Sequence, residues 1–240
     1  MSRKHRGSIA VIGLAAALLL SGTPDTASAD WAALSWDACG AEVLAKQFAC
    51  DTNVGRSRFV VSARTETLGP QGVHFECELE IVLASSVVPA WWQLSAGECR
   101  PGAIAYSADE QPEDAACQYP WFALPSLSIG MSVDPAQPRI ALSVLGVDVT
   151  GTNQLPPSVE SFVLTIGISH EKSVGDGACA GCSTEACILL RRLTLIDYPD
   201  RVNMPLLLGH DMLAWQSTSA NCTVTPTRNR TWGAIKSLYR

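Results

Sequence analysis

The sequence contains none of the short motifs that identify the best-known catalytic centres. It has no G-x-S-x-G nucleophile elbow, no H-E-x-x-H zinc helix and no phosphate-cradling glycine loop. The acidic segment SADEQPED, residues 107–114, lacks the regular carboxylate spacing of a calcium loop. These absences exclude enzymes built on those templates, and we expect no cofactor and no bound metal.

Positive charge is also scarce. The chain has 17 Lys and Arg against 23 Asp and Glu among its 240 residues, a formal net charge of −6. Without residues 1–29, 14 basic and 22 acidic residues remain, and the net charge becomes −8. Nucleic acids and anionic membranes bind clustered Lys and Arg. The charge balance therefore argues against nucleic acid as a partner.

No apolar run is long enough for a stable membrane anchor. The run Ile9–Leu20 falls short of the roughly 20 residues that span a bilayer. It follows a basic start and precedes the small-residue sequence ASA at residues 27–29. This order is typical of a signal peptide, which we assign to residues 1–29. We expect an exported protein, periplasmic or extracellular, with no membrane span in its mature form.

Long helical patterns are almost missing, and alternation of apolar and polar residues takes their place. The alternation predicts strands over residues 57–66, 73–84, 126–134, 138–150, 160–171, 186–197 and 211–217. Helical pattern is confined to residues 40–48 and to the C-terminal TWGAIKSLY. Because no long helices alternate with the strands, we predict an all-β fold, an antiparallel β-sandwich of which the jelly roll is one form.

The mature chain is expected to form one domain. Residues 30–225 contain every predicted strand, with no internal repeat and no low-complexity linker. Residues 226–240 differ because they are basic and aromatic. We expect them to form a short helix that docks on the domain or serves as a recognition tag.

Two of the predicted strands indicate which side chains face inward. In VHFECELEI, residues 73–81, Cys77 shares the apolar face, whereas the glutamates lie on the opposite face. In RIALSVLGVDV, residues 139–149, the apolar residues change from even-numbered to odd-numbered positions beside Gly146. This shift predicts a β-bulge at Gly146.

All nine cysteines follow the predicted signal peptide, and cysteines normally pair in an oxidising compartment. Nine is odd, and Cys77 is the candidate free thiol because a cysteine on an apolar face behaves as a small core residue. The other eight are predicted to form disulfides: Cys39, Cys50, Cys99, Cys117, Cys179, Cys182, Cys187 and Cys222. Short loops favour Cys39 with Cys50 and Cys99 with Cys117, and the last four have three possible pairings.

The segment GACAGCSTEACILL, residues 177–190, allows three interpretations. Cys179 and Cys182 have the C-x-x-C spacing of a zinc site, but no second C-x-x-C accompanies them. A redox centre needs the pair at a helix N-terminus, whereas here a glycine-rich loop leads into an apolar strand. A structural crosslink is favoured, since a disulfide stabilises such a loop, typically by ~2–4 kcal/mol.

The sequence resembles a group of uncharacterised exported bacterial β-rich proteins. The resemblance is carried by SWDAC, FACDTN, WWQLSAGECR, CAGCSTEACILL and the terminal RTWGAIKSLYR. Members of the group open with an aromatic-Asp-x-Cys stretch and carry a C-x-x-C-x-x-x-x-C-I-x-L segment before a late strand. This chain departs from the group in Cys77 and in the pair Arg191–Arg192. The resemblance implies export and an all-β fold, and no known activity.

Glu76, Glu78 and Glu80 are the candidate catalytic residues. They share one face of a strand, about 6.6 Å apart at successive positions, and loosely resemble the E-x-D-x-E strand of jelly-roll glucanases. Retaining glycosidases place two carboxyl groups ~5–5.5 Å apart. The competing interpretation is a charged outward face that keeps the strand soluble.

Trp91, Trp92 and Trp121 are the candidate ligand-binding residues. Neighbouring residues of an extended segment point to opposite faces, so one indole of the Trp91–Trp92 pair is expected to face outward. An exposed indole can stack on a sugar or anchor a protein.

The favoured function is therefore a non-enzymatic exported module that binds or displays a carbohydrate or a cell-surface protein. The first alternative is a jelly-roll glycoside hydrolase that uses the strand with Glu76, Glu78 and Glu80. The second alternative is a thiol-redox or zinc protein that uses Cys179 and Cys182.

Overall fold

A computed structural model describes most of the chain after the predicted signal peptide. The described residues are 30–40, 43–66, 73–109, 117–121, 125–134, 137–148, 155–197, 200–219 and 222. The predicted signal peptide, residues 1–29, and the predicted docking segment, residues 226–240, lie outside them. No helix within the described residues is long and apolar enough to span a membrane.

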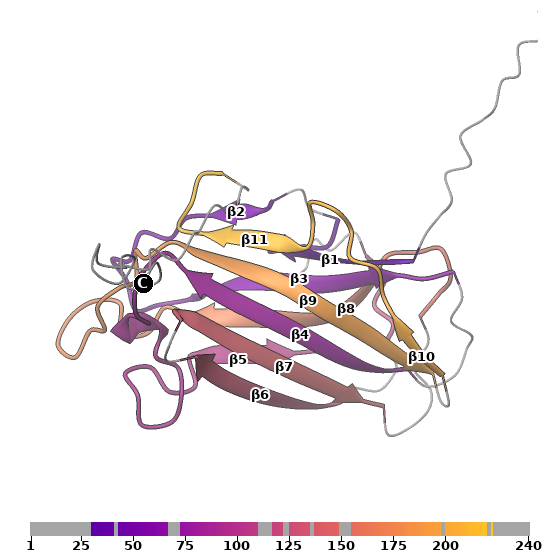
Figure 1. Cartoon of the computed structure of the whole chain (residues 1–240), viewed down its shortest axis with the longest axis horizontal. Coiled ribbons are helices and arrows are strands. Elements are labelled where there is room, and N and C mark those ends of the chain that lie inside the picture. The colour runs from indigo at the N-terminus through magenta and orange to yellow at the C-terminus, as the bar shows by residue number, and fades with distance from the viewer. Residues whose placement is uncertain are drawn as a thin grey trace, which may run out of the picture.

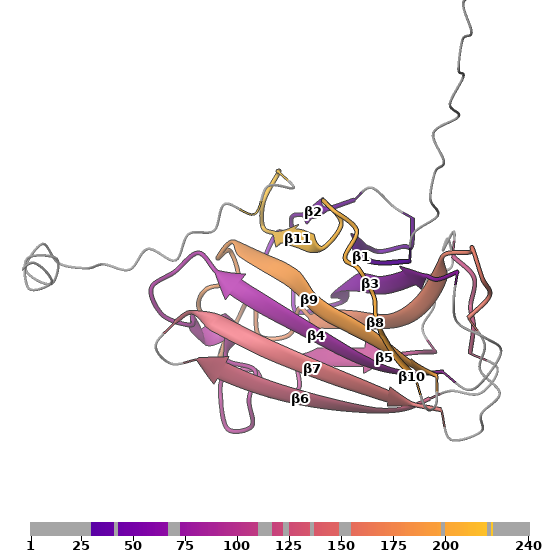
Figure 2. The ribbon, with the colours of Figure 1, turned by 45° about the vertical axis from the view of Figure 1, so that its right-hand side comes forward.

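The strands form two sheets that pack face to face, as Figures 1 and 2 show. The four-stranded sheet has the order β1 (Trp31–Trp36), β3 (Arg56–Arg64), β8 (Ser161–Ser169) and β5 (Ile104–Ser107). The seven-stranded sheet has the order β2 (Ala45–Lys46), β11 (Met212–Trp215), β9 (Ala186–Asp197), β4 (Val73–Leu83), β7 (Arg139–Val147) and β6 (Ser126–Asp134). Strand β10 (Asp200–Asn203) adds to β9. Every strand pair is antiparallel except β2 with β11.

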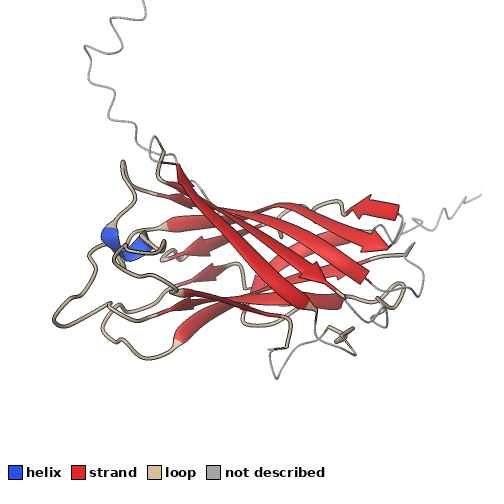
Figure 3. Cartoon of the chain, turned by 90° about the horizontal axis from the view of Figure 1, so that it is seen from below, coloured by secondary structure: helices blue, strands red, loops and turns tan. Residues whose placement is uncertain are grey.

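The predicted all-β sandwich is confirmed, and each of the predicted strands is present. Sequence reasoning missed the short strands β2, β5 and β10, and also β1. The helix expected over residues 40–48 is wrong, because Ala45 and Lys46 pair with β11 instead. The helical element of the described residues is a single 3₁₀ turn, η1 (Ala90–Trp92), which Figure 3 shows at one end of the two layers.

The core lies between the sheets and follows the alternation of the strands. On β4, Phe75, Cys77 and Ile81 are fully buried, whereas the glutamates between them reach the surface. The inward side chains of β7, β8 and β9 complete the same apolar cluster. The predicted inward position of Cys77 is therefore confirmed, and β4 presents its glutamates on the outer face of the seven-stranded sheet.

The bulge predicted beside Gly146 is wrong. The pairing of β4 with β7 runs without a register shift, and Gly146 lies directly opposite Phe75. A Cβ atom on Gly146 would lie 2.2 Å from Cε1 of Phe75. The inward site at Gly146 is thus filled by the Phe75 ring. The alternation continues past it, so Leu145 faces outward and is 37% exposed.

Within the described strands, two bulges occur elsewhere, and sequence reasoning did not find them. On β9 the register shifts so that Glu78 pairs with Arg192 and Leu79 with Leu190, which leaves Arg191 as an extra residue. A bulge of this kind lets two successive side chains emerge on one face. Arg191 and Arg192 are accordingly both exposed. The second bulge, on β8, makes Val163 the extra residue.

Replacement of Gly146 by Ala tests the close packing of the Phe75 ring. Overpacking of this kind costs typically ~1–3 kcal/mol, and we expect the free energy of unfolding, measured in urea, to fall by about that amount. The matched control is Gly130→Ala on neighbouring β6, where the nearest atom to an added Cβ is 3.9 Å away. Equal effects of the two substitutions would contradict the assigned role of the ring.

Candidate functional site

The three tryptophans proposed as binding residues are buried. Trp91 and Trp92 are both 0% exposed and Trp121 is 4% exposed. Trp91 and Trp92 lie in the 3₁₀ turn η1 instead of an extended segment, so both rings turn inward and meet edge to face, with centroids 5.0 Å apart. The prediction that one of them faces outward is wrong, since a turn does not alternate faces.

Trp91 and Trp121 serve the scaffold. The indole N–H of Trp91 donates to Oγ of Ser173 at 3.0 Å. The indole N–H of Trp121 donates at 3.1 Å to the carbonyl of Val163, the extra residue of the β8 bulge. The large exposed hydrophobic residues of the described chain are all aliphatic: Val43, Val54, Val87, Leu145, Val159 and Leu208. The stacking platform proposed for a sugar is therefore not formed by these tryptophans.

All eight cysteines assigned to disulfides are bridged, but not as short loops suggested. The bridges are Cys39–Cys117, Cys50–Cys182, Cys99–Cys179 and Cys187–Cys222. The expected pairs of Cys39 with Cys50 and Cys99 with Cys117 are wrong, because the packing of the sheets brings together cysteines far apart in the chain. Cys77 is the free cysteine and is buried.

The C-x-x-C pair is divided between two bridges. Cys182 is bonded to Cys50 and Cys179 to Cys99, so neither sulfur is available for exchange with the other or for a metal. Within the described residues, no group of three or more His, Cys, Asp or Glu is placed to hold a metal ion. The thiol-redox and zinc alternative is therefore overturned, and the segment is a structural crosslink.

Arg100 holds the loop between β8 and β9, residues 170–185, from inside the protein. Its side chain is 2% exposed, and Nε donates to the carbonyl of Glu171 at 2.9 Å while Nη1 donates to the carbonyl of Trp91 at 2.8 Å. Nη2 donates to the carbonyl of Ser169, and the guanidinium carbon lies 3.6 Å from the centroid of the Trp91 ring. Burial lowers the pKa of Arg100 to about 10, against the opposing effect of Glu171, so the group is charged at neutral pH. We call Arg100 and the disulfides Cys50–Cys182 and Cys99–Cys179 the loop clamp.

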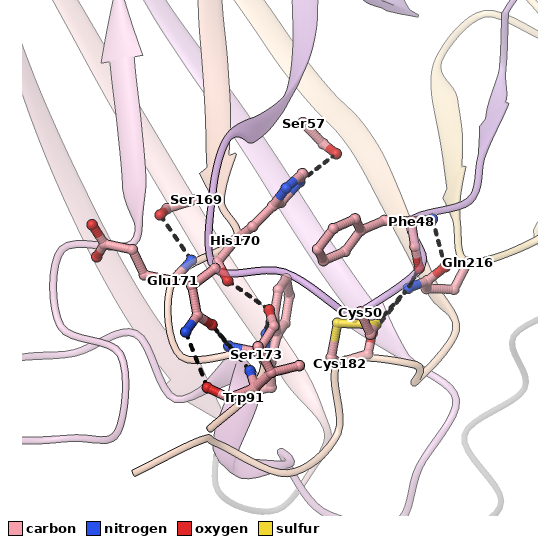
Figure 4. Close-up of a disulfide and its surroundings, with 12 residues drawn as sticks. Phe48, Cys50, Ser57, Trp91, Ser169, His170, Glu171, Ser173, Cys182 and Gln216 are labelled. Atoms are coloured by element: carbon pink, nitrogen blue, oxygen red, sulfur yellow. Dashed lines mark hydrogen bonds between the residues drawn. A yellow bond between two sulfur atoms is a disulfide. The ribbon is translucent and has the colours of Figure 1, made fainter. Parts of the chain in front are cut away.

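His170 lies beside the loop clamp and pairs with a serine (Figure 4). Its Nε2 is 3.0 Å from Oγ of Ser57, its Nδ1 is 3.2 Å from the carbonyl of Val54, and its ring stacks on Phe48. Burial lowers the pKa of His170, and the nearby positive charges act in the same direction, which favours the neutral ring. A serine–histidine pair suggests a nucleophile, but Ser57 is 1% exposed and out of reach of a substrate. The pair connects β3 to the loop.

The three candidate catalytic glutamates are bound by arginines on the outer face of the seven-stranded sheet. Arg201 donates to Glu76 at 2.5 Å and Arg192 to Glu78 at 2.5 Å. Glu80 accepts from Nη1 of Arg139 at 3.0 Å and from Nε of Arg191 at 2.7 Å. The β9 bulge makes this match possible because it places both Arg191 and Arg192 on the face of the glutamates. We call these seven residues the charge ladder.

The charge ladder does not have the chemistry of a glycosidase. A retaining glycosidase needs one carboxyl group that holds a proton for the leaving group. Each of the three glutamates is instead engaged in an ion pair with an arginine, so the ladder supports the competing interpretation of a charged outward face.

A groove of about 480 Å³ lies on the outer face next to the charge ladder. Its lining includes the small residues Gly130, Ser132, Ala141 and Ser143 of β6 and β7, together with Met131 and Leu142. Glu80 and Arg191 line it on the side of β4 and β9. The groove exists because short side chains on two strands adjoin long side chains on the next two. No sequence motif indicated it.

No known protein family and no curated protein matches the sequence. Among solved structures the chain is similar to the second type II cohesin module from the cellulosomal adaptor ScaA scaffoldin of Acetivibrio cellulolyticus, with 7% identity and a TM-score of 0.34 over 75% of this chain and 92% of that one. It is also similar to a non-cellulosomal cohesin from the hyperthermophilic archaeon Archaeoglobus fulgidus, with 7% identity and a TM-score of 0.31 over 77% and 89% of the two chains. Likenesses at this level concern the fold and say nothing about a ligand.

Alkylation of the oxidised protein tests the state of the cysteines. Burial raises the pKa of the Cys77 thiol well above its usual range, and the charge of Glu78 adds to the effect. Since the thiolate is the reactive form, we expect iodoacetamide at mildly alkaline pH to label nothing in the folded protein. After unfolding without reductant, Cys77 should take the label. Labelling of Cys179 or Cys182 in the folded protein would contradict the bridged state.

Proposed function

We propose that this protein is an exported, non-enzymatic β-sandwich module that binds another protein through the groove and the charge ladder. Four disulfides and the lack of a membrane-spanning helix within the described residues are consistent with a periplasmic or extracellular protein. The groove carries the proposal, because it joins a floor of small outward-facing residues to a row of ion pairs on one sheet face.

A protein suits this face better than a carbohydrate. Sugar-binding surfaces use exposed aromatic rings for stacking, and the three tryptophans proposed for that role are buried. The groove offers a floor of small residues, Gly130 and Ala141, to an apolar side chain and the hydroxyl groups of Ser132 and Ser143 to a peptide backbone. Apolar contacts ringed by polar and charged groups are typical of protein interfaces.

The charge ladder indicates the chemistry of the partner. It combines four arginines with three glutamates in a chain whose formal net charge is −6. Two of the arginines share Glu80, and the Arg191 side chain, which lines the groove, is 51% exposed. Complementary charges across an interface set specificity and orientation. The partner is therefore expected to place an apolar side chain in the groove and an acidic side chain against Arg191.

Selection from a random peptide display library tests this proposal with a defined probe. Peptides selected on the oxidised protein are synthesised, and their dissociation constants are measured by calorimetry. We expect an apolar residue beside an acidic one in the selected sequences. Ser143→Trp fills the groove and should weaken binding at least about tenfold. Val87→Trp, at a 69% exposed site outside the groove, is the matched control.

A charge reversal distinguishes specific binding in the groove from nonspecific binding. Arg191→Glu should weaken binding of the acidic peptide and strengthen binding of the same peptide with Lys in place of the acidic residue. Selected peptides that bind Ser143→Trp and the parent equally well would refute the groove as the binding site. Binding of glycans, with no peptide selected, would refute a protein partner.

A further inference from the structure

Strand β6 forms an open edge of the seven-stranded sheet. It pairs with β7 in continuous register from Ser126 to Asp134. On its other side, no described residue makes a strand pair or a backbone hydrogen bond with residues 126–133. In Figures 1 and 2, β6 borders the sheet on the side away from β2 and β11. Every second residue of such an edge directs its N–H and C=O groups away from the sheet.

The other sheet edges in the described part of the chain are short or covered. Strands β2, β5 and β10 have two to four residues each. Strand β1 is longer, but its outer amides donate to other segments: Ala32 to the carbonyl of Pro205 at 2.8 Å and Leu34 to the carbonyl of His210 at 2.6 Å. Strand β6 is thus unlike them, with nine residues and an exposed edge.

Strand β6 also lacks the features that keep an edge from pairing. Natural edge strands are interrupted by proline, lysine, inward charges or bulges. The sequence SLSIGMSVD has no proline and no basic residue, its register has no shift, and its one charged residue is the terminal Asp134. Ser126, Ser128, Gly130 and Ser132 face outward, and the alternate apolar residues are half-buried. The edge is therefore regular and uninterrupted, as strand addition requires.

We infer that β6 pairs with β6 of a second copy of this chain, antiparallel and centred on Gly130. This register places Ser128 opposite Ser132 and Ser126 opposite Asp134, so no charge meets a like charge. It also places Leu127 opposite Val133 and Ile129 opposite Met131, so apolar side chains meet on the inner face. Opposite residues of antiparallel strands point to the same face of a sheet. The enlarged sheet therefore keeps its serines on the outer face and its apolar side chains on the inner face. The shared edge is about 30 Å long at ~3.3 Å per residue.

This pairing bears on the groove, although it does not depend on the proposed function. The two-fold axis that relates two antiparallel strands is perpendicular to the sheet, so the outer faces of the two copies lie on the same side. The groove is lined partly by Gly130 and Ser132 of β6. Two grooves would then adjoin across the shared edge. Such a dimer presents two binding sites on one surface and gains from multivalent contact.

Sedimentation of the oxidised protein over a range of concentrations tests the pairing. We expect a reversible dimer for the parent chain. The double variant Ser128→Lys and Ser132→Lys places like charges opposite each other and should weaken self-association at least about tenfold. Val87→Lys adds one positive charge at an exposed loop position and should leave the dimer intact. Unfolding in urea checks that each variant is folded.

A charge-swap mixture makes the result specific to the edge. The double variant Ser128→Glu and Ser132→Glu should also be monomeric, whereas an equal mixture of the lysine and glutamate variants should form dimers. A parent chain that sediments as a monomer at every concentration would overturn the inference. Dimers that persist in the lysine variant, or a mixture that stays monomeric, would also overturn it, since the contact would then lie elsewhere or not exist.

Discussion

The loop between β8 and β9 depends on one buried positive charge. Burying a guanidinium costs several kcal/mol unless its donors are satisfied. Arg100 offsets this cost with three backbone carbonyls and the face of Trp91. Those acceptors come from η1, from the end of β8 and from the loop itself. Cys50–Cys182 and Cys99–Cys179 tie the same loop to two other parts of the chain and so help to hold these acceptors in place.

The loop clamp explains why the aromatic residues are unavailable to a ligand. Trp91 is stacked beneath Arg100 and hydrogen-bonded to Ser173, and it also contacts Trp92 and Trp215. The aromatic residues at this end are therefore used to fill the space between the sheets. The groove and the charge ladder lie instead on the outer face of the seven-stranded sheet.

Local patterns predicted the strands well, because alternation is a property of each strand alone. Cys77 and the glutamates of β4 lie on the faces that the alternation assigned to them. The same reasoning failed at Gly146, where the missing side chain looked like a shift in parity. Only the position of the Phe75 ring on the neighbouring strand explains this glycine.

Features that join distant segments were beyond sequence reasoning. The disulfide partners are separated by 35 to 132 residues, so the short-loop rule chose wrongly. The groove escaped notice for a related reason: its lining comes from four strands, and each contributes only ordinary residues. The adjacent arginines Arg191 and Arg192 were visible as a departure from the resembled group, but their match to the glutamates required the β9 bulge.

Disulfide mapping of the oxidised protein tests the central claim, that Cys179 and Cys182 fasten the loop to two different segments. Digestion after lysine, arginine and glutamate cuts at Glu185 and so separates both cysteines from Cys187. The account predicts one linked species that contains the loop peptide joined to the peptides of both Cys50 and Cys99. A loop peptide closed on itself by a Cys179–Cys182 bridge, with Cys50 and Cys99 bonded elsewhere, would contradict it.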